Sequence, residues 1–373
     1  MKREIKLIKF IEIRYADPIS SMDLTNDYLL FGTMLGATKL FKINKQELIS
    51  LSEVQDEYVS GVKINENKLY ICVGDLKIFQ YNLGDNEDLS SPDKEILNYE
   101  DTKIHEEKCD NCLSMLCENF LVRTYIESQK KKDKDKEENK LNEKEVFFKN
   151  IYVDDDENKI FRRVKMYDYS VPFDYDGVNY IFIDFVSQNH RNFNIYDVNS
   201  KEMKLNVEID TFNNEKIGHI SHLKIINNDL IFIVRDFNIC ELRNFKFELV
   251  KKLNVKASEI LAFDVLYYEN VEEKNVDNNN STNTDIKEKE SAKDKEINCI
   301  AFLDIDCNVF LYNYKEDKNE LLFNLDKDNL GIDDDIKGQG FFIFNYPYYI
   351  KISKKYIAIS SDYGCILIQY NKN

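Results

Sequence analysis

The sequence lacks the segments by which membrane-spanning and secreted proteins are recognised. No run of about 18 uncharged apolar residues occurs, so we expect no membrane span. Residues 1–10 carry charges among their apolar side chains and contain no apolar signal-peptide core. The 8 Cys among 373 residues are scattered without a dense framework. We therefore expect reduced thiols and a cytoplasmic or nuclear location.

Positive charge is also scarce. The chain has 51 Lys and Arg against 68 Asp and Glu, which gives a net charge of −17. Broad, non-specific nucleic-acid binding depends on cationic contacts with phosphates, so we do not expect it. Repulsion from anionic membrane surfaces is expected as well. One local basic patch would still be compatible with this charge.

The motifs of the common enzyme classes are absent. The sequence has no nucleophile elbow, P-loop, dinucleotide-binding glycine turn or His-Glu-x-x-His motif, and no sustained amphipathic helix. Cys109 and Cys112 have the Cys-x2-Cys spacing of zinc sites, with His105 and Cys117 nearby. However, Cys112 and Cys117 would point to opposite faces of a strand, and no second Cys-x2-Cys follows. We therefore expect no metal, no cofactor and no enzymatic activity.

Strand-forming residues are abundant, with 23 Tyr, 24 Phe and many Ile. Residues 355–371 show the pattern most clearly, because two apolar runs flank a polar turn that contains Asp362 and Gly364. This arrangement predicts a β-hairpin. Similar hairpins recur along the chain, and their expected third strands end at Asn44, Asn82, Asp154, Asp197, Asn244, Asn313 and Asn371.

Two charged, polar segments interrupt this repetition. Residues 129–145 and 269–296 have too few apolar side chains to bury, so we expect disordered inserts there. Without them, the spacing of the hairpins approaches the roughly 40–45 residues of a propeller repeat. The regular spacing favours a propeller, with two β-sandwiches as the alternative.

The hairpin at 355–371 also resembles the centre of a WD40 blade. The order Ser-x-Asp-x-Gly-x-Ile-x-Ile-x-Tyr-Asn, from residue 360 to 371, places an Asp in the turn and an aromatic residue followed by Asn at the strand end, although the chain has no Trp. Gly218-His219 similarly resembles the Gly-His pair of such blades. The resemblance implies structural roles for His219, Asp236, Asp306, Asp362 and Tyr370. It also implies that His219 hydrogen-bonds Asp236 and a Ser or Thr.

We therefore expect residues 1–373 to form a single all-β domain, a seven-bladed WD40-like β-propeller. Its last blade would be one strand short, and residues 4–13 would supply that strand and close the ring.

This resemblance implies a non-catalytic scaffold, a subunit of a larger complex that binds other proteins. Residues 340–349 contain six aromatic side chains in ten. Aromatic residues are favoured at interface hot spots. We expect partner contacts from Phe341, Phe342, Phe344, Tyr346 and Tyr348.

Two other functions remain open at this point. Residues 218–223 and 230–236 resemble one blade of the non-catalytic propeller subunit of the tRNA guanine-N7 methyltransferase. That resemblance would imply a methyltransferase partner and action on tRNA, although it ends after Asp236. A propeller enzyme, with acidic or His residues converging on a central channel, is the third class.

Overall fold

The computed structural model describes the chain as β-strands and connecting turns. The described residues are 4–13, 17–53, 58–73, 77–83, 89, 92–97, 109–117, 120–127, 143–150, 160–165, 173–176, 178–187, 190–197, 199–200, 202–209, 217–227, 229–268, 296–328, 330, 348–361 and 363–370, with the backbone alone between 109 and 165. The expectation of an all-β chain is confirmed for these residues. No helix among them is long and apolar enough to cross a bilayer.

The described strands form seven four-stranded antiparallel sheets, numbered here in chain order. The first contains β2 (Ile19–Leu24), β3 (Tyr28–Thr33), β4 (Ala37–Lys42) and β5 (Glu47–Glu53). The second contains β6 (Val59–Asn65), β7 (Lys68–Val73), β8 (Lys77–Asn82) and β9 (Lys94–Leu97). The third contains β10 (Cys109–Cys117), β11 (Phe120–Glu127), β12 (Glu143–Asn150) and β13 (Ile160–Lys165).

The remaining sheets follow the same order. The fourth contains β14 (Phe173–Tyr175), β15 (Asn179–Ser187), β16 (His190–Asp197) and β17 (Glu202–Glu208). The fifth contains β18 (Ile220–Ile225), β19 (Leu230–Arg235), β20 (Ile239–Asn244) and β21 (Leu249–Leu253). The sixth contains β22 (Ile260–Tyr267), β23 (Ile297–Asp304), β24 (Asn308–Asn313) and β25 (Lys318–Asn324). The seventh contains β26 (Ile350–Ile352), β27 (Tyr356–Ser361), β28 (Gly364–Tyr370) and β1 (Ile5–Glu12).

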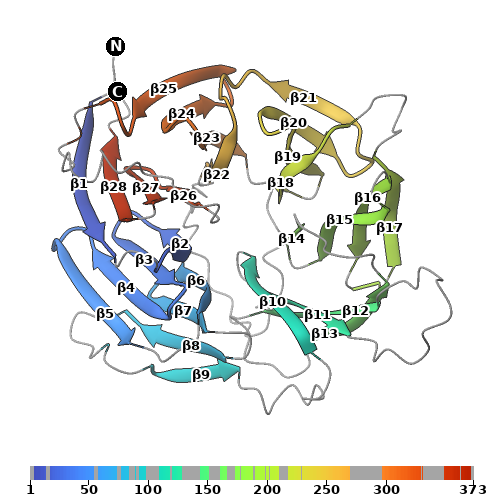
Figure 1. Ribbon diagram of the computed structural model, residues 1–373, viewed down its shortest axis with the longest axis horizontal. Coiled ribbons are helices and arrows are strands. Elements are labelled where there is room, and N and C mark those ends of the chain that lie inside the picture. Colours follow the sequence, from blue (N-terminus) through green and yellow to red (C-terminus); the bar gives the residue numbers. More distant parts are fainter. Residues whose placement is uncertain are drawn as a thin grey trace, which may run out of the picture.

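The sheets have a propeller-like arrangement. Figure 1 shows them around a common centre, with the first strand of each of the first six sheets, and β26 of the seventh, innermost. Alternation of apolar residues gives each strand two packing faces, and sheets stacked side by side bury both faces. Apolar clusters join the first sheet to the second, the fourth to the fifth, the fifth to the sixth, the sixth to the seventh, and the seventh to the first.

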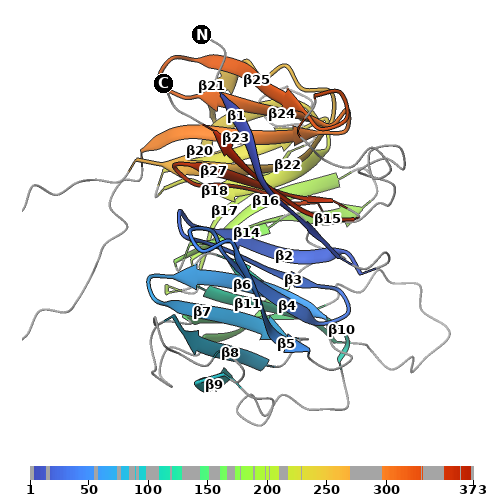
Figure 2. The ribbon, with the colours of Figure 1, turned by 90° about the vertical axis from the view of Figure 1, so that its left-hand side faces the viewer.

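The N-terminal strand lies where we expected residues 4–13, on the outer side of the last hairpin. β1 pairs antiparallel with β28, from Ile5 opposite Tyr370 to Glu12 opposite Gly364. The two strands come close at Gly364, where a Cβ atom would lie 2.1 Å from the carbonyl oxygen of Ile11. Figure 1 and Figure 2 show β1, in dark blue, beside the red strands of this last hairpin.

The innermost strands carry Asp and Lys in alternation at equivalent register positions. These inner-strand charges are Asp23, Lys63, Asp174, Lys224, Asp264 and Lys351, which pair respectively with Leu30, Tyr70, Ile181, Phe232, Ala301 and Ala358. An innermost strand is the edge of its sheet, so alternate main-chain amides have no partner within the sheet.

Each Asp of this series accepts a hydrogen bond from the innermost strand of the next sheet in chain order. The donor is the main-chain amide of the Ile that directly follows the Lys of that strand. The amide of Ile64 donates to Asp23 Oδ2 (2.8 Å), that of Ile225 to Asp174 Oδ2 (2.7 Å), and that of Ile352 to Asp264 Oδ2 (3.0 Å). The preceding lysines add ion pairs: Lys63 Nζ is 3.4 Å from Asp23, and Lys224 Nζ is 3.7 Å and Lys351 Nζ 3.9 Å from Asp264. Neighbouring sheets are therefore held at the centre by directional bonds as well as by apolar packing.

The structure shifts the boundary of the first expected insert. β12 begins at Glu143, so residues 143–145 belong to a strand. Lys144 and Glu145 pair there with Ile126 and Tyr125 of β11 and so extend the hairpin. The rest of the insert expected at 129–145 lies outside the described residues, as do residues 269–295 of the second. Glu296, the last residue of that second insert, is described: its carbonyl accepts a hydrogen bond from the amide of Tyr268 at 2.8 Å.

Deleting residues 1–13 should lower the melting temperature strongly. Ile11 and Ile13 are 2% and 7% exposed, and their burial alone contributes about 3–6 kcal/mol. The deletion also leaves β28 as an unpaired edge, so we expect aggregation at high protein concentration. Differential scanning calorimetry and light scattering measure both effects. Deletion of residues 129–141 is the length-matched control and should change the melting temperature little. Equal melting temperatures for the two deletions would contradict the role assigned to β1.

Candidate functional site

The turn between β19 and β20 has an unusual backbone. Asp236 and Phe237 both have positive φ, at 49° and 67°. Two-residue hairpin turns of this kind favour Asn, Asp and Gly, and a bulky residue with positive φ is a steric outlier. The Phe237 side chain is 44% exposed, so burial in this chain does not offset the strain.

Asp236 is fixed by the segment that enters the same sheet. Its Oδ1 accepts a hydrogen bond from the amide of His219 (3.1 Å), and its own amide donates to the His219 carbonyl (2.7 Å). A Cβ atom at residue 218 would lie 1.5 Å from this carboxylate oxygen, so a side chain there would displace the Asp236 carboxylate. The structure thus brings together the residues of the Gly-His resemblance, but the bond to Asp236 comes from the main chain of His219.

The imidazole of His219 lies instead against the Phe237 ring, with the ring centroids 5.3 Å apart. Burial lowers the pKa of His219, the charge of Arg191 lowers it further, and Asp236 opposes both effects. The neutral form of the imidazole is therefore favoured over the charged form.

A buried group of charges supports the same hairpin. Glu241 and Arg243 are each 1% exposed. Arg243 donates to Glu241 Oε2 through Nε (3.0 Å) and Nη2 (2.7 Å), and Arg235 donates to Glu241 Oε1 through Nε (2.9 Å). Arg243 Nη1 also donates to the carbonyl of Phe247 at 2.8 Å. Sequence reasoning missed this group, although Glu and Arg two residues apart within an apolar strand were a visible signal.

His222 connects the fifth and sixth sheets. Its Nε2 lies 3.1 Å from the carbonyl oxygen of Leu261, which can only accept, so Nε2 is the donor. Its Nδ1 lies 3.0 Å from the hydroxyl of Ser221. Burial lowers the pKa of His222, while the hydrogen bond to Leu261 raises it and the nearby His219 lowers it. The blade histidine that bonds a neighbouring sheet through its ring is therefore His222.

The other predicted motif residues have separate positions. Asp306 is exposed, and its amide donates to Oδ1 of Asp304 (3.1 Å). Asp304 is 1% exposed and also accepts from the amides of Ser258 (3.2 Å) and Asn308 (2.9 Å). The structural carboxylate of this turn is thus Asp304. The Tyr370 hydroxyl donates to the carbonyl of Ser353 (2.7 Å), and Asp362 lies outside the described residues.

The predicted aromatic contact segment is described only at its end. Tyr348 packs, half-buried, against the core between the sixth and seventh sheets. Phe341, Phe342, Phe344 and Tyr346 lie outside the described residues. The next residue, Tyr349, donates its hydroxyl to the carbonyl of Ser20 (2.5 Å) and so joins the seventh sheet to the first. Burial raises the pKa of Tyr349 to about 12, which keeps this donor protonated.

Cys109, Cys112 and Cys117 are residues of strand β10. Among the side chains that the structure describes, no group of three or more His, Cys, Asp or Glu could hold a metal ion.

Exposed apolar side chains recur at the tips of the hairpins between second and third strands. Leu35 is 64% exposed, Met34 42%, Phe237 44% and Ile305 50%. We call these four residues the hairpin-tip face. Main-chain bonds place the tips on one side of the molecule, beside the segments that enter the innermost strands: Ile260 N donates to Phe237 O (2.7 Å), and Ile305 N to Glu259 O (2.8 Å).

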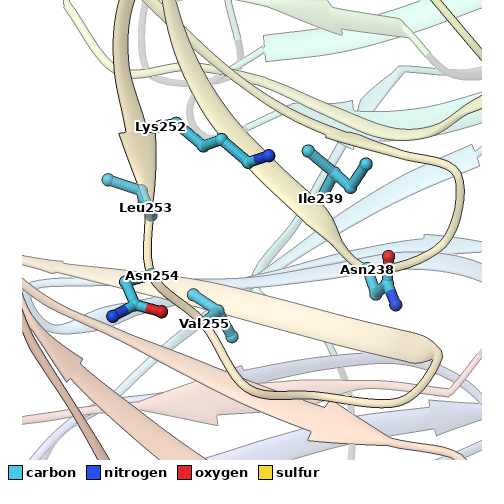
Figure 3. A pocket seen from close by; sticks show the side chains of 6 residues that line it. All are labelled: Asn238, Ile239, Lys252, Leu253, Asn254 and Val255. Atoms are coloured by element: carbon cyan, nitrogen blue, oxygen red, sulfur yellow. The ribbon is translucent and has the colours of Figure 1, made fainter.

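A shallow pocket of about 400 Å³ adjoins the Phe237 tip. The start of β20 and the end of β21 line it, through Asn238, Ile239, Lys252, Leu253, Asn254 and Val255. Figure 3 shows the Lys252 side chain extending from its strand towards Ile239. The pocket therefore combines three apolar side chains with two amide side chains and one positive charge.

Replacing Glu241 by Ala should destabilise the protein by about 3–5 kcal/mol, because the Arg243 guanidinium would stay buried without its carboxylate. Urea unfolding followed by circular dichroism measures the change. Glu248→Ala is the matched control: Glu248 is exposed and bonds Asn244 Nδ2 (2.8 Å), so we expect a change of about 0.5 kcal/mol or less. Similar losses for both variants would contradict the assigned role of Glu241.

His222 should make stability depend on pH. Its folded pKa lies below the ordinary value, so the unfolded chain binds more protons between the two pKa values. The stability that the protein gains from keeping His222 neutral is therefore fully present above pH about 6.5, and it decreases as the pH falls below that value. Melting temperatures across this range should fall less for His222→Gln than for the unmodified chain. Identical pH profiles for the two proteins would contradict this assignment.

Comparisons with known proteins support the fold and leave the function open. No protein-family model matches the sequence, and no curated protein matches it. The structure is similar to the computationally designed Ika8 protein, with a TM-score of 0.51 and 8% identity over 98% of this chain and 100% of that one. It is also similar to a chain of the Mitotic Checkpoint Complex, with a TM-score of 0.54 and 9% identity over 100% of this chain and 92% of that one. At such identities the likeness concerns the fold alone, and a repeat β fold agrees with both matches.

Proposed function

We propose that this protein is a non-catalytic interaction scaffold, a WD40-like propeller subunit of a larger protein complex. The observation that carries the proposal is the hairpin-tip face. Turn tips normally carry Gly, Asn, Asp or Ser, because these residues suit the turn backbone and the solvent. Single exposed apolar residues are common, but here they recur at equivalent tips of the first, fifth and sixth sheets. A partner that covers this face would bury them.

We infer further that the seven sheets are seven blades of a closed ring. Apolar clusters join five pairs of neighbouring sheets, and β6 of the second sheet lies beside β10 of the third. The inner-strand charges support the same number. Strict alternation of Asp and Lys around a ring needs an even number of positions. A ring of seven blades therefore needs one position that breaks the alternation, and a neutral residue does so without placing two like charges side by side. The equivalent residue on β10 is Met115, which pairs with Val122.

The roles of the described polar side chains favour binding over catalysis. The carboxylates of Asp23, Glu241, Asp264 and Asp304 are each engaged with main-chain amides or buried cations that hold the sheets. The described cysteines Cys240, Cys307 and Cys365 are buried and form no disulfide. Reduced thiols are typical of a reducing compartment, which supports the proposed cytoplasmic or nuclear location.

Affinity purification of the tagged protein from its own cells tests the proposal. We expect a stoichiometric complex with the intact chain. The triple variant Leu35→Asn, Phe237→Asn and Ile305→Asn should lose that complex without losing its melting temperature. The matched control is Leu48→Asn with Val250→Asn and Leu321→Asn, which alters exposed apolar residues on outer strands instead.

Two outcomes would contradict the scaffold. One is the absence of any stoichiometric partner of the intact chain, and the other is substrate turnover by the purified protein alone. The sequence-based alternative is decided by the same purification. It requires a methyltransferase as the partner, and depletion of this chain must then lower guanine-N7 methylation of tRNA.

A further inference from the structure

Phe237 combines exposure with backbone strain. Its φ of 67° lies in the left-handed region, which costs of order 1–3 kcal/mol for a residue other than glycine. A strained residue persists only where the surrounding structure holds it, and such positions gather at ligand-binding sites. Asn or Gly would relieve the strain, and neither would expose an aromatic ring. Packing against His219 leaves the ring 44% exposed, so this contact accounts for only part of the preference for Phe at this position.

The surrounding structure holds this hairpin rigidly. The Phe237 carbonyl accepts the amide of Ile260 (2.7 Å) from the next sheet, and its ring rests on His219. Arg235, which precedes the turn, binds both Asp236 (Nη1 to Oδ2, 3.1 Å) and the buried Glu241. A contact residue fixed in this way loses little conformational freedom on binding.

The pocket beside the tip has the properties of a side-chain binding site. Ile239 and Val255 are half-buried and supply apolar walls. Lys252 lines the same pocket, and exposed Lys256 follows one residue beyond it. Neither lysine forms an ion pair with another residue in the described part of the chain. Two such cations are notable on a chain whose net charge is −17.

We propose that Phe237 and this pocket form a docking site for an extended peptide segment of a partner protein, in which an apolar side chain stands next to an Asp or Glu. The apolar side chain would enter the pocket against Ile239 and Val255, and a flanking part of the segment would contact the exposed Phe237 ring. The neighbouring carboxylate would meet Lys252. The net charge of −17 of the whole chain repels such a segment, so charge complementarity directs it to the lysines at this place. This proposal rests on the proposed scaffold function and names the binding site within it.

Selection from a displayed library of random peptides against the intact purified chain tests the site. We expect enriched peptides that share an apolar residue beside Asp or Glu. Phe237→Asn should weaken binding of these peptides at least about tenfold, as loss of an aromatic anchor does. Lys252→Glu should reverse the preference and enrich peptides with Lys or Arg beside the apolar residue.

The variants separate binding from folding. Asn tolerates the left-handed backbone, so Phe237→Asn should keep or raise the melting temperature. Leu321→Asn, which alters a 53% exposed leucine on β25, is the matched control and should bind the peptides as the unmodified chain does. An empty selection, peptides without an acidic residue, or equal binding by Phe237→Asn would overturn the proposal. So would binding of single-stranded RNA, and not of peptides, that depends on Phe237 and Lys252.

The cellular complex distinguishes this proposal from the scaffold function. If Phe237→Asn and Lys252→Glu both retain the partner that the triple tip variant loses, the Phe237 site is overturned and the scaffold stands. If the intact chain has no partner, the scaffold itself fails.

Discussion

The arrangement depends on how the innermost strands satisfy their main-chain amides. Each is the edge of a sheet, and an edge exposes amides that would otherwise pair with another chain. Asp23, Asp174 and Asp264 each accept such an amide from a neighbouring sheet. Because a carboxylate bond to an amide is short and directional, it fixes the position of one sheet relative to the next, which apolar packing alone leaves looser.

The candidate binding site is a consequence of this placement. Sheets that are fixed at the centre bring the hairpin tips of separate repeats to one side of the molecule. In the fifth sheet the buried group of Arg235, Glu241 and Arg243 then holds the tip beneath Phe237. Buried charges of this kind give little net stability and strongly penalise the loss of one partner. The interior charges thereby fix the position of the tip, whose Phe237 is 44% exposed.

Local pattern was sufficient for the strands and their order. Short β-branched and aromatic runs around polar turns correctly predicted the hairpin of β27 and β28 and the pairing of β1 with β28, because a strand needs only alternating side chains and a turn that matches its twist. Local pattern failed where neighbouring residues compete for one role. Asp304 and Asp306 share a turn, and only the three-dimensional path of the chain shows that Asp304 faces the amides while Asp306 faces solvent. The same limit applies to His219 and His222, which differ in what the next sheet presents to them.

The sequence by itself determined an all-β chain of repeated hairpins, because strand propensity and turn chemistry act over a few neighbouring residues. It also contained the Lys-Ile pairs at 63–64, 224–225 and 351–352. Their role in joining sheets depends on the Asp residues that accept the Ile amides, which lie 41, 51 and 88 positions earlier in the chain. Only the tertiary structure decided which carboxylates are buried, which histidine bridges two sheets and which turn residue is strained and exposed. The physical reason is that burial, hydrogen bonding and pKa depend on neighbours in space, and the stacking of separate sheets brings those neighbours together.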